Sequence, residues 1–225
     1  MSETEFFKVK LIKKNKIAEE VGEFHFEKPA GYNYLAGQFV QFKIPGGDTA
    51  VLRSYSISNS PDKSDLEFCI KILPTGKGSV WLASLEVGSE VEISAAKGYF
   101  TQNLPGNKYY IATGVGLAPI MAMLESRKET AEKLRLLFGV REEKDVFWKD
   151  RLANLKKENK NFDYILTVSR PGESWNGEKG RVTEHLNVDL LSQYYICGNV
   201  QMVKDVRAYL LANGLNTKSI HMEIF

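Results

Sequence analysis

Cysteine and net charge are scarce in this sequence of 225 residues. Its two cysteines, Cys69 and Cys197, are far apart and belong to no C-x-x-C series, which excludes an iron–sulfur cluster or zinc site with four cysteine ligands from this chain. The low cysteine content favours a reducing compartment. A formal net charge of +2 gives no reason to expect nucleic acid or an anionic membrane as a partner.

Long apolar segments are also missing. No apolar run approaches the roughly 20 residues that span a bilayer, and the first residues, MSETEFFKVK, lack the basic start and apolar core of a signal peptide. We therefore expect a cytoplasmic protein without a membrane span. Lysines cluster at 8–16 and 156–160. We interpret these clusters as solvated faces, with docking of an acidic partner as the alternative.

Short segments with period-two alternation fill the first hundred residues. They are EFHFE, QFVQFKI, LEFCIKIL and EVEIS. Such alternation is typical of antiparallel strands with one buried face, and the turn residues between the segments favour a barrel or a sandwich. One helix is expected to begin near Ser79.

The pattern changes after TQNLPGN at 101–107, which is typical of a linker. Apolar strands then alternate with segments of helical periodicity, as in KYYIAT followed by LAPIMAMLESRKE. Alternating strands and helices predict βαβ units and a parallel sheet. The sequence thus predicts an all-β domain over 1–100, a linker over 101–107 and an α/β domain over 108–225.

The first strand-to-helix turn of the second half contains Gly114-x-Gly116, followed by Pro119. Glycines let the backbone approach a pyrophosphate closely, and the start of the next helix offers free N–H groups to the anion. The third glycine of the dinucleotide-binding fingerprint is absent, and no acidic residue ends the second strand, so this is not the standard motif. The alternative is a tight turn that binds no nucleotide.

Several ordered motifs together resemble the ferredoxin–NADP reductase superfamily. They are LRSYSIS at 52–58, GKGSVWL at 76–82, AKGYF at 96–100, TGVGLAP at 113–119, FGVREEKDVFW at 138–148, VSRP at 168–171, YYICGN at 194–199 and MEIF at 222–225. The resemblance covers nearly the whole chain. It implies an N-terminal six-stranded antiparallel β-barrel that binds FAD and a C-terminal α/β domain, with a five-stranded parallel sheet, that binds NAD(P)H.

The resemblance also implies which residues hold FAD. They are Arg53, Ser54, Tyr55, Ser56, Ile70, Lys71, Ile72, Gly76, Lys77, Gly78, Ser79 and Phe225. A guanidinium suits a diphosphate, an aromatic ring can cover the flavin, and a hydroxyl can bond the flavin nitrogen that receives hydride. The glycine–serine element serves the adenylate half and therefore favours FAD over FMN. The alternatives are an ordinary strand for 53–56, a helix N-cap for Ser79 and the end of a core strand for Phe225.

On the nucleotide side, the resemblance implies a second set of contacts. They are Thr113, Gly114, Val115, Gly116, Arg141, Ser169, Arg170, Arg181, Cys197 and Gly198. We predict Ser56, Cys197 and Glu223 as the catalytic residues, with a small buried core residue as the alternative for Cys197. The arginines could clamp a 2′-phosphate, whereas Glu142, Glu143 and Asp145 could repel one. We take NADPH as the first expectation and leave NADH open.

The resemblance therefore implies an enzyme that transfers hydride from NAD(P)H to bound FAD and passes electrons to a separate acceptor. A ferredoxin or flavodoxin is the first expected acceptor, and an oxygenase component is the second. A reductase of free flavins and a non-catalytic nucleotide-sensing or electron-wire subunit are the alternatives. The histidines His25, His185 and His221 do not cluster in the sequence, so we predict no metal site. The oligomeric state is left open, with a monomer as the working expectation.

Overall fold

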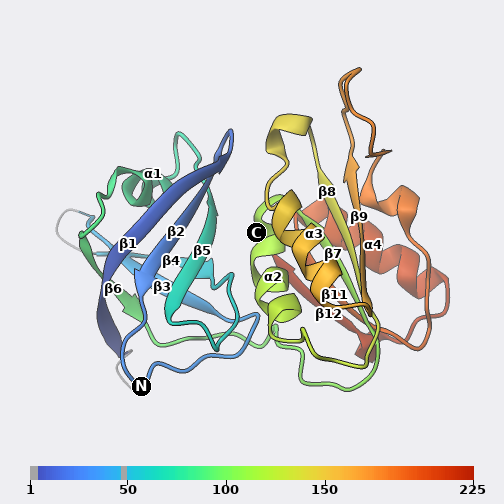
Figure 1. Cartoon of the computed structure of the whole chain (residues 1–225), viewed down its shortest axis with the longest axis horizontal. Helices are drawn as coiled ribbons and strands as arrows, with labels where there is room; N and C mark the ends of the chain where they lie inside the picture. The colour runs from blue at the N-terminus through green and yellow to red at the C-terminus, as the bar shows by residue number, and fades with distance from the viewer. Residues whose placement is uncertain (1–4, 47–49) are drawn as a thin grey trace.

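The computed structural model describes residues 5–46 and 50–225 and shows two halves side by side (Figure 1). The described residues of the first half form one short helix and six strands: β1 (Phe6–Ala18), β2 (Val21–Glu27), β3 (Phe39–Ile44), β4 (Val51–Ser56), β5 (Asp65–Lys71), α1 (Lys77–Ser84) and β6 (Glu90–Ser94). All its strand pairs are antiparallel, in the order β4-β3-β6-β1-β2-β5. Among the described residues, no helix is long and apolar enough to cross a membrane.

The core of the first half is aromatic. The rings of Phe26, Phe42 and Phe68 lie with their centroids 5.0–5.9 Å apart and are fully buried. They come from β2, β3 and β5, so alternate residues of three strands meet on one face, as the period-two pattern predicts. The exposed lysines of β1 flank its buried residues Val9 and Leu11, which agrees with solvated faces.

The predicted closure into a β-barrel is wrong. β4 and β5 are the edges of the sheet, and the bridge of Ile57 to Phe68 is isolated rather than part of a strand ladder. A closed barrel needs a continuous, staggered ladder around its whole circumference. Alternation along a strand shows which face is buried, but it carries no information on whether two edge strands meet.

The second half alternates strands and helices. Its elements are β7 (Lys108–Thr113), α2 (Leu117–Glu125), β8 (Leu134–Val140), α3 (Lys149–Glu158), β9 (Phe162–Val168), β10 (Glu178–Lys179), β11 (Gln193–Gly198), α4 (Val200–Ala212) and β12 (Ile220–Ile224). Short 3-10 turns at Gly114–Gly116, Glu143–Asp145, Val182–His185 and Thr217–Ser219 complete it. The strands pair in parallel in the order β10-β9-β8-β7-β11-β12.

The parallel sheet has six strands, where five were predicted. The extra strand, β10, consists of Glu178 and Lys179, which pair with Thr167 and Val168 of β9. Both residues of β10 are exposed and charged, so no apolar run in the sequence marks this strand.

One apolar cluster joins the two halves. All residues from Leu117 to Leu124 in α2 are buried, and Val21, Ala36 and Cys69 of the first half belong to the same cluster. Figure 1 shows α2 at the face of the second half that meets the first. The halves therefore share a core, while the domain bounds 1–100 and 108–225 stay a prediction.

Candidate functional site

Several of the predicted site residues lie together at the carboxyl ends of three neighbouring strands. Cys197 of β11 pairs with Ala112 of β7 on one side and with Glu223 of β12 on the other. Figure 1 shows the C-terminus, just after β12, between the two halves. Ligands of open α/β sheets bind outside the carboxyl ends of the strands. The structure therefore brings Thr113, Cys197 and Glu223 together at one such edge.

The turn after β7 allows very close backbone contact. A Cβ atom on Gly116 would lie 2.3 Å from the carbonyl oxygen of Cys197, so only glycine fits there. Gly114 has a φ of +54° and open space around it, as a backbone that faces a ligand would. The Thr113 hydroxyl accepts a hydrogen bond of 3.2 Å from the Asn199 amide, which ties this turn to β11.

Burial controls the charge of Cys197 and Glu223. Burial, and then the nearby charge of Glu223, raise the pKa of the fully buried Cys197 thiol well above its ordinary value. Burial also raises the pKa of Glu223 to about 7. Oε2 of Glu223 is buried and has no hydrogen-bond partner among residues 5–46 and 50–225. Cys197 therefore stays a neutral thiol, and Glu223 can gain or lose a proton near neutral pH.

The edge strand β4 presents the predicted flavin residues. Arg53 and Ser54 are exposed, and the hydrogen bond found for the Arg53 guanidinium goes only to the Leu52 carbonyl, at 2.9 Å, in the described structure. Tyr55 packs edge-on against Phe42, with centroids 5.7 Å apart. The hydroxyl of Ser56 is buried without a hydrogen-bond partner in the described part of the chain. A buried hydroxyl without a partner is costly unless a ligand supplies one.

A groove of about 680 Å³ lies beside the start of α1. Its lining residues are Ile44, Pro45, Gly46, Pro74, Thr75, Gly76, Lys77, Val80 and Trp81. Sequence reasoning identified Gly76 and Lys77 and missed the others, because residues 44–46, at the end of β3, come close to α1 only in the folded chain. Trp81, an aromatic residue one helical turn after Lys77, was the signal that could have been used.

The amino-terminal end of α1 lies against β4. A Cβ atom on Gly78 would lie 2.6 Å from the Tyr55 hydroxyl and 2.9 Å from Cγ of Arg53. The helix begins at Lys77, so Ser79 is not its N-cap. The Ser79 hydroxyl instead accepts a 3.1 Å hydrogen bond from the Leu73 amide and holds the preceding turn. The exposed cation, the unpartnered hydroxyl and the groove together fit the phosphates, ring and adenylate of FAD.

Two other predicted flavin contacts have constrained side chains. Ile70 is buried in the core, and Lys71 pairs with Glu20 at 3.2 Å, so this strand can meet a flavin mainly through its backbone. Ile72 is partly buried. Phe225 has an exposed fraction of 51%, and its amide donates to the Gly198 carbonyl at 3.2 Å. Its role beside the flavin stays a prediction.

The predicted arginines lie at one rim of the parallel sheet. Arg141 follows β8 and Arg170 follows β9, and the Arg170 amide donates to the Arg141 carbonyl at 2.8 Å. Arg181 precedes the turn that begins at Val182. All three arginines are exposed, as is Ser169. The structure thus brings Arg141 and Arg170 together.

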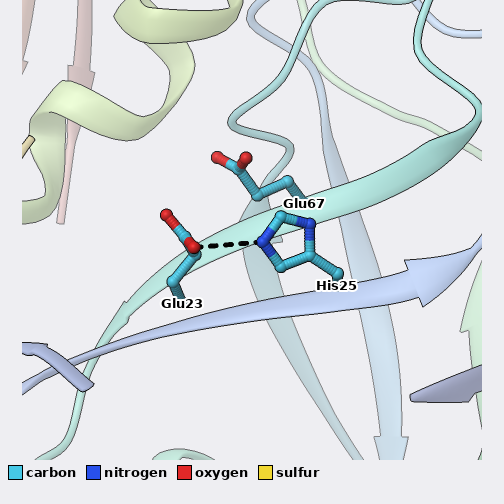
Figure 2. A group of neighbouring side chains, drawn as sticks. All are labelled: Glu23, His25 and Glu67. Atoms are coloured by element: carbon cyan, nitrogen blue, oxygen red, sulfur yellow. Dashed lines mark hydrogen bonds and ion pairs between the residues drawn. The ribbon is translucent and has the colours of Figure 1, made fainter. Parts of the chain in front are cut away.

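One polar cluster was missed because Glu67 is distant in sequence from Glu23 and His25. Glu23, His25 and Glu67 offer atoms that all lie within 4.8 Å of one another (Figure 2). Both ring nitrogens of His25 face carboxylates, with Nδ1 2.6 Å from Asp65 and Nε2 3.1 Å from Glu23. These contacts define an ion-pair network, and strand pairing of β2 with β5 was needed to reveal it.

Comparison with known proteins covers both halves. The family model for an oxidoreductase FAD-binding domain matches residues 8–102, and that for an oxidoreductase NAD-binding domain matches residues 110–208. Ferredoxin–NADP reductase B of Sorangium cellulosum is 32% identical, over 99% of this chain and 99% of the relative. The anthranilate 1,2-dioxygenase electron transfer component of Acinetobacter baylyi is 32% identical over 86% of this chain, but only 58% of the relative is covered.

A solved structure shows the same fold. The ferredoxin NADP+ reductase from Neisseria gonorrhoeae, with bound FAD and NADP, superposes with a TM-score of 0.87 over 99% of both chains at 24% identity. With these matches and the site in view, the chain belongs to the ferredoxin–NADP reductase superfamily. It is an FAD-dependent oxidoreductase that takes electrons from a pyridine nucleotide and passes them to a separate acceptor.

Proposed function

We propose that the chain is a ferredoxin- or flavodoxin–NADP reductase-like enzyme with FAD along β4 and α1 and the nucleotide at the carboxyl ends of β7 and β11. One observation carries this proposal. Four buried side-chain atoms have no hydrogen-bond partner within the described residues, and two of them, Ser56 Oγ and Glu223 Oε2, belong to predicted catalytic residues. Such atoms favour a site that is completed by a ligand.

The flavin side has a specific division of roles. FAD, when bound, accepts a hydride and releases single electrons. Arg53 would hold its diphosphate through forked hydrogen bonds, and the first amides of α1 would hold the same anion. Ser56 would donate its hydroxyl hydrogen to the reactive edge of the ring. Trp81 and the groove would take the adenine, which favours FAD over FMN because FMN lacks that half.

On the nucleotide side, the chain would orient the nicotinamide and exclude water. The turn at Gly114–Gly116 would hold the pyrophosphate, and Thr113 and Cys197 would position the nicotinamide. A neutral thiol at Cys197 adds no charge beside a ring that must approach closely. Glu223 would hold or release a proton at Oε2 near neutral pH, since burial raises its pKa to about 7.

The rim favours NADPH over NADH. Glu143 accepts hydrogen bonds from the Gly172 amide at 3.0 Å and the Ser174 hydroxyl at 3.1 Å, so this carboxylate is already engaged within the loop. Asp145 accepts from the Glu142 amide at 3.0 Å. Arg141 and Arg170 remain exposed beside each other and could bind a 2′-phosphate.

Arg170→Ala tests this preference. We expect kcat/KM with NADPH to fall by about tenfold or more, because a charged hydrogen bond is lost, and kcat/KM with NADH to stay within about twofold. Arg207→Ala, at an exposed position on α4, is the control for the loss of a surface charge. Unchanged nucleotide selectivity in Arg170→Ala would mean that this arginine does not bind the phosphate.

A ferredoxin or flavodoxin is the first proposed acceptor, and an oxygenase component is the second. Relatives from oxygenase systems support the second, although the chain spans only 58–61% of the length of the first oxygenase relatives that it matches. Steady-state reduction of a purified ferredoxin, a flavodoxin and free flavins distinguishes these acceptors. Turnover with free flavins alone, by a preparation that does not retain FAD, would contradict the proposal. The monomeric state and the cytoplasmic location stay predictions.

A further inference from the structure

A polar bridge crosses from one half of the molecule to the other at Arg151. This residue lies on α3 of the second half, and its Nη1 donates to Oε1 of Glu67 on β5 of the first half, at 2.6 Å. Its Nε donates to Oε1 of Glu125, the last residue of α2, at 2.8 Å. The side chains of Glu67 and Glu125 are only 8% and 9% exposed, so water screens these bonds weakly. We call these three residues the Arg151 bridge.

Trp148 makes a second connection beside this bridge. Its indole Nε1 donates to Oε2 of Glu23 on β2, at 2.7 Å, and the Arg151 guanidinium lies 4.5 Å from the centre of its ring. Trp148 has a φ of +55°, the only positive φ of a non-glycine residue in the described part of the chain. A bulky residue keeps this left-handed conformation only where its surroundings enforce it. The contacts across the interface account for this strain.

The first half presents its side of the contact in a fixed arrangement. Figure 2 shows Glu23 and His25 on one strand and Glu67 on the next. Glu23 Oε1 bonds His25 at 3.1 Å and Asn15 at 3.2 Å, and the Ser58 hydroxyl donates to Glu67 Oε1 at 2.7 Å. Because these carboxylates already have partners, they orient toward Trp148 and Arg151 as one unit.

The bridge joins the two elements that lead to the cofactor sites. Glu67 is on β5, which continues into the predicted flavin residues Ile70 and Lys71. Glu125 ends α2, the helix that begins directly after the turn Gly114–Gly116. Both elements are rigid secondary structure, so a change at the bridge would move the flavin strand relative to the nucleotide turn.

We propose that Arg151 is a positioning residue for hydride transfer, because it holds β5 and α2, and therefore the two cofactor sites, at a fixed separation. This proposal rests on the proposed function for the location of those sites. Hydride transfer needs the reacting atoms within about 3–3.5 Å, and a misplacement of about 1 Å can cost roughly 100-fold in rate. Arg151 contacts neither predicted cofactor site and acts through Glu67 and Glu125.

The test compares variants of the FAD-loaded enzyme. Arg151→Met removes the forked donor and keeps most of the stem, and Arg151→Lys keeps the charge. Glu67→Gln removes the negative charge that faces Arg151 across the interface and leaves the bond between Arg151 and Glu125 in place, although Glu67 Oε1 also accepts from the Ser58 hydroxyl within the first half. Lys156→Met is the matched control, since Lys156 lies on the same helix and pairs with Asp163 of β9 within the second half. The measurements are the rate of flavin reduction at saturating NAD(P)H, the nucleotide dissociation constant, and the isotope effect with nucleotide deuterated at the transferred position.

We expect Arg151→Met to lower the limiting rate by about 10- to 100-fold, with the nucleotide dissociation constant within about twofold of wild type and an isotope effect that persists. The limiting rate of Arg151→Lys should lie between those of Arg151→Met and wild type, and the rate of Lys156→Met should match wild type. A full rate in Arg151→Met would overturn the proposal, as would an equal loss in Lys156→Met. If Arg151→Met fails to fold, the same measurements on Glu67→Gln test the proposal, and a full rate in Glu67→Gln would overturn it.

Hydrogen exchange supplies a readout that does not depend on catalysis. We expect faster amide exchange in Arg151→Met at 65–71 and 117–125, with the remaining strands unchanged. Unchanged amide exchange at both segments would overturn the proposed role of the Arg151 bridge, even if the rate of flavin reduction fell. If the wild-type chain does not oxidise NAD(P)H, the proposed function fails, while the exchange pattern still decides whether Arg151 holds the two halves together.

Discussion

Glu223→Gln tests the electrostatics of the proposed site through folding stability. Glu223 pairs with Cys197 across two strands, and its Oε2 is buried without a partner in the residues that the structure describes. Burial raises the pKa of this carboxyl from 4.5 to about 7. The folded protein therefore keeps a proton that the unfolded chain releases, and the contribution of Glu223 to stability falls as the pH rises from 4.5 to about 7.

The size of this effect follows from the pKa. A rise in pKa from 4.5 to about 7 corresponds to roughly 3 kcal/mol in the free energy of unfolding for a fully buried group. Glu223 is only partly buried, and solvent screening reduces the expectation to about 1–2 kcal/mol. Glutamine has the same shape and does not titrate. The free energy of unfolding of the variant, relative to wild type, should therefore rise by this amount between about pH 4 and about pH 8.

Denaturant unfolding at a series of pH values, followed by circular dichroism, measures this difference. Glu129→Gln, at an exposed position after α2, controls for the loss of one surface charge. A difference in unfolding free energy between Glu223→Gln and wild type that does not change with pH, or that falls as the pH rises, would contradict a raised pKa for Glu223. It would mean that the Glu223 carboxylate is already stabilised by a partner in the folded protein.

Three further substitutions test the cofactor sites. Gly116→Ala places a Cβ atom 2.3 Å from the Cys197 carbonyl oxygen, so we expect a loss of about 1–3 kcal/mol in unfolding free energy and weaker nucleotide binding. In Gly114→Ala the new Cβ atom meets no atom within 4 Å, but the alanine must adopt a strained positive φ. We expect this strain to lower the free energy of unfolding, measured by thermal unfolding, by about 1–2 kcal/mol. Trp81→Ala should weaken FAD binding about tenfold in a fluorescence titration and leave FMN binding within about twofold, because only FAD carries an adenine; equal weakening of both flavins would contradict the role of Trp81.

Patterns of hydrophobicity predicted most of the fold. The buried alternation of Phe24 and Phe26 revealed β2, and the change to helical period after residue 107 revealed the parallel sheet. β1 was not identified from its own pattern, because only Val9 and Leu11 are buried along its thirteen residues. The strand β10 was also beyond such patterns because both its residues are exposed and charged. The open edges of the first sheet were beyond them because closure depends on whether β4 and β5, which are not adjacent in that sheet, meet.

The candidate site could be predicted only in part. Gly116 and Cys197 lie in recognisable motifs, and the structure brings them into backbone contact. Trp81 was missed because the groove forms only when residues 44–46 come close to α1 in the folded chain. Arg151 and Glu67 are 84 positions apart, so their ion pair carries no local signal in the sequence. What a single sequence cannot show is which charged residues meet across the interface between two halves.

We propose that each half holds one dinucleotide and that the two bound molecules react with each other. The most direct test is an anaerobic titration of the FAD-loaded protein with NADPH and, separately, with NADH, followed by the absorbance of the oxidised flavin. A stoichiometric amount of at least one nucleotide should bleach this absorbance. A flavin spectrum that stays unchanged in excess NADPH and in excess NADH would contradict this proposal.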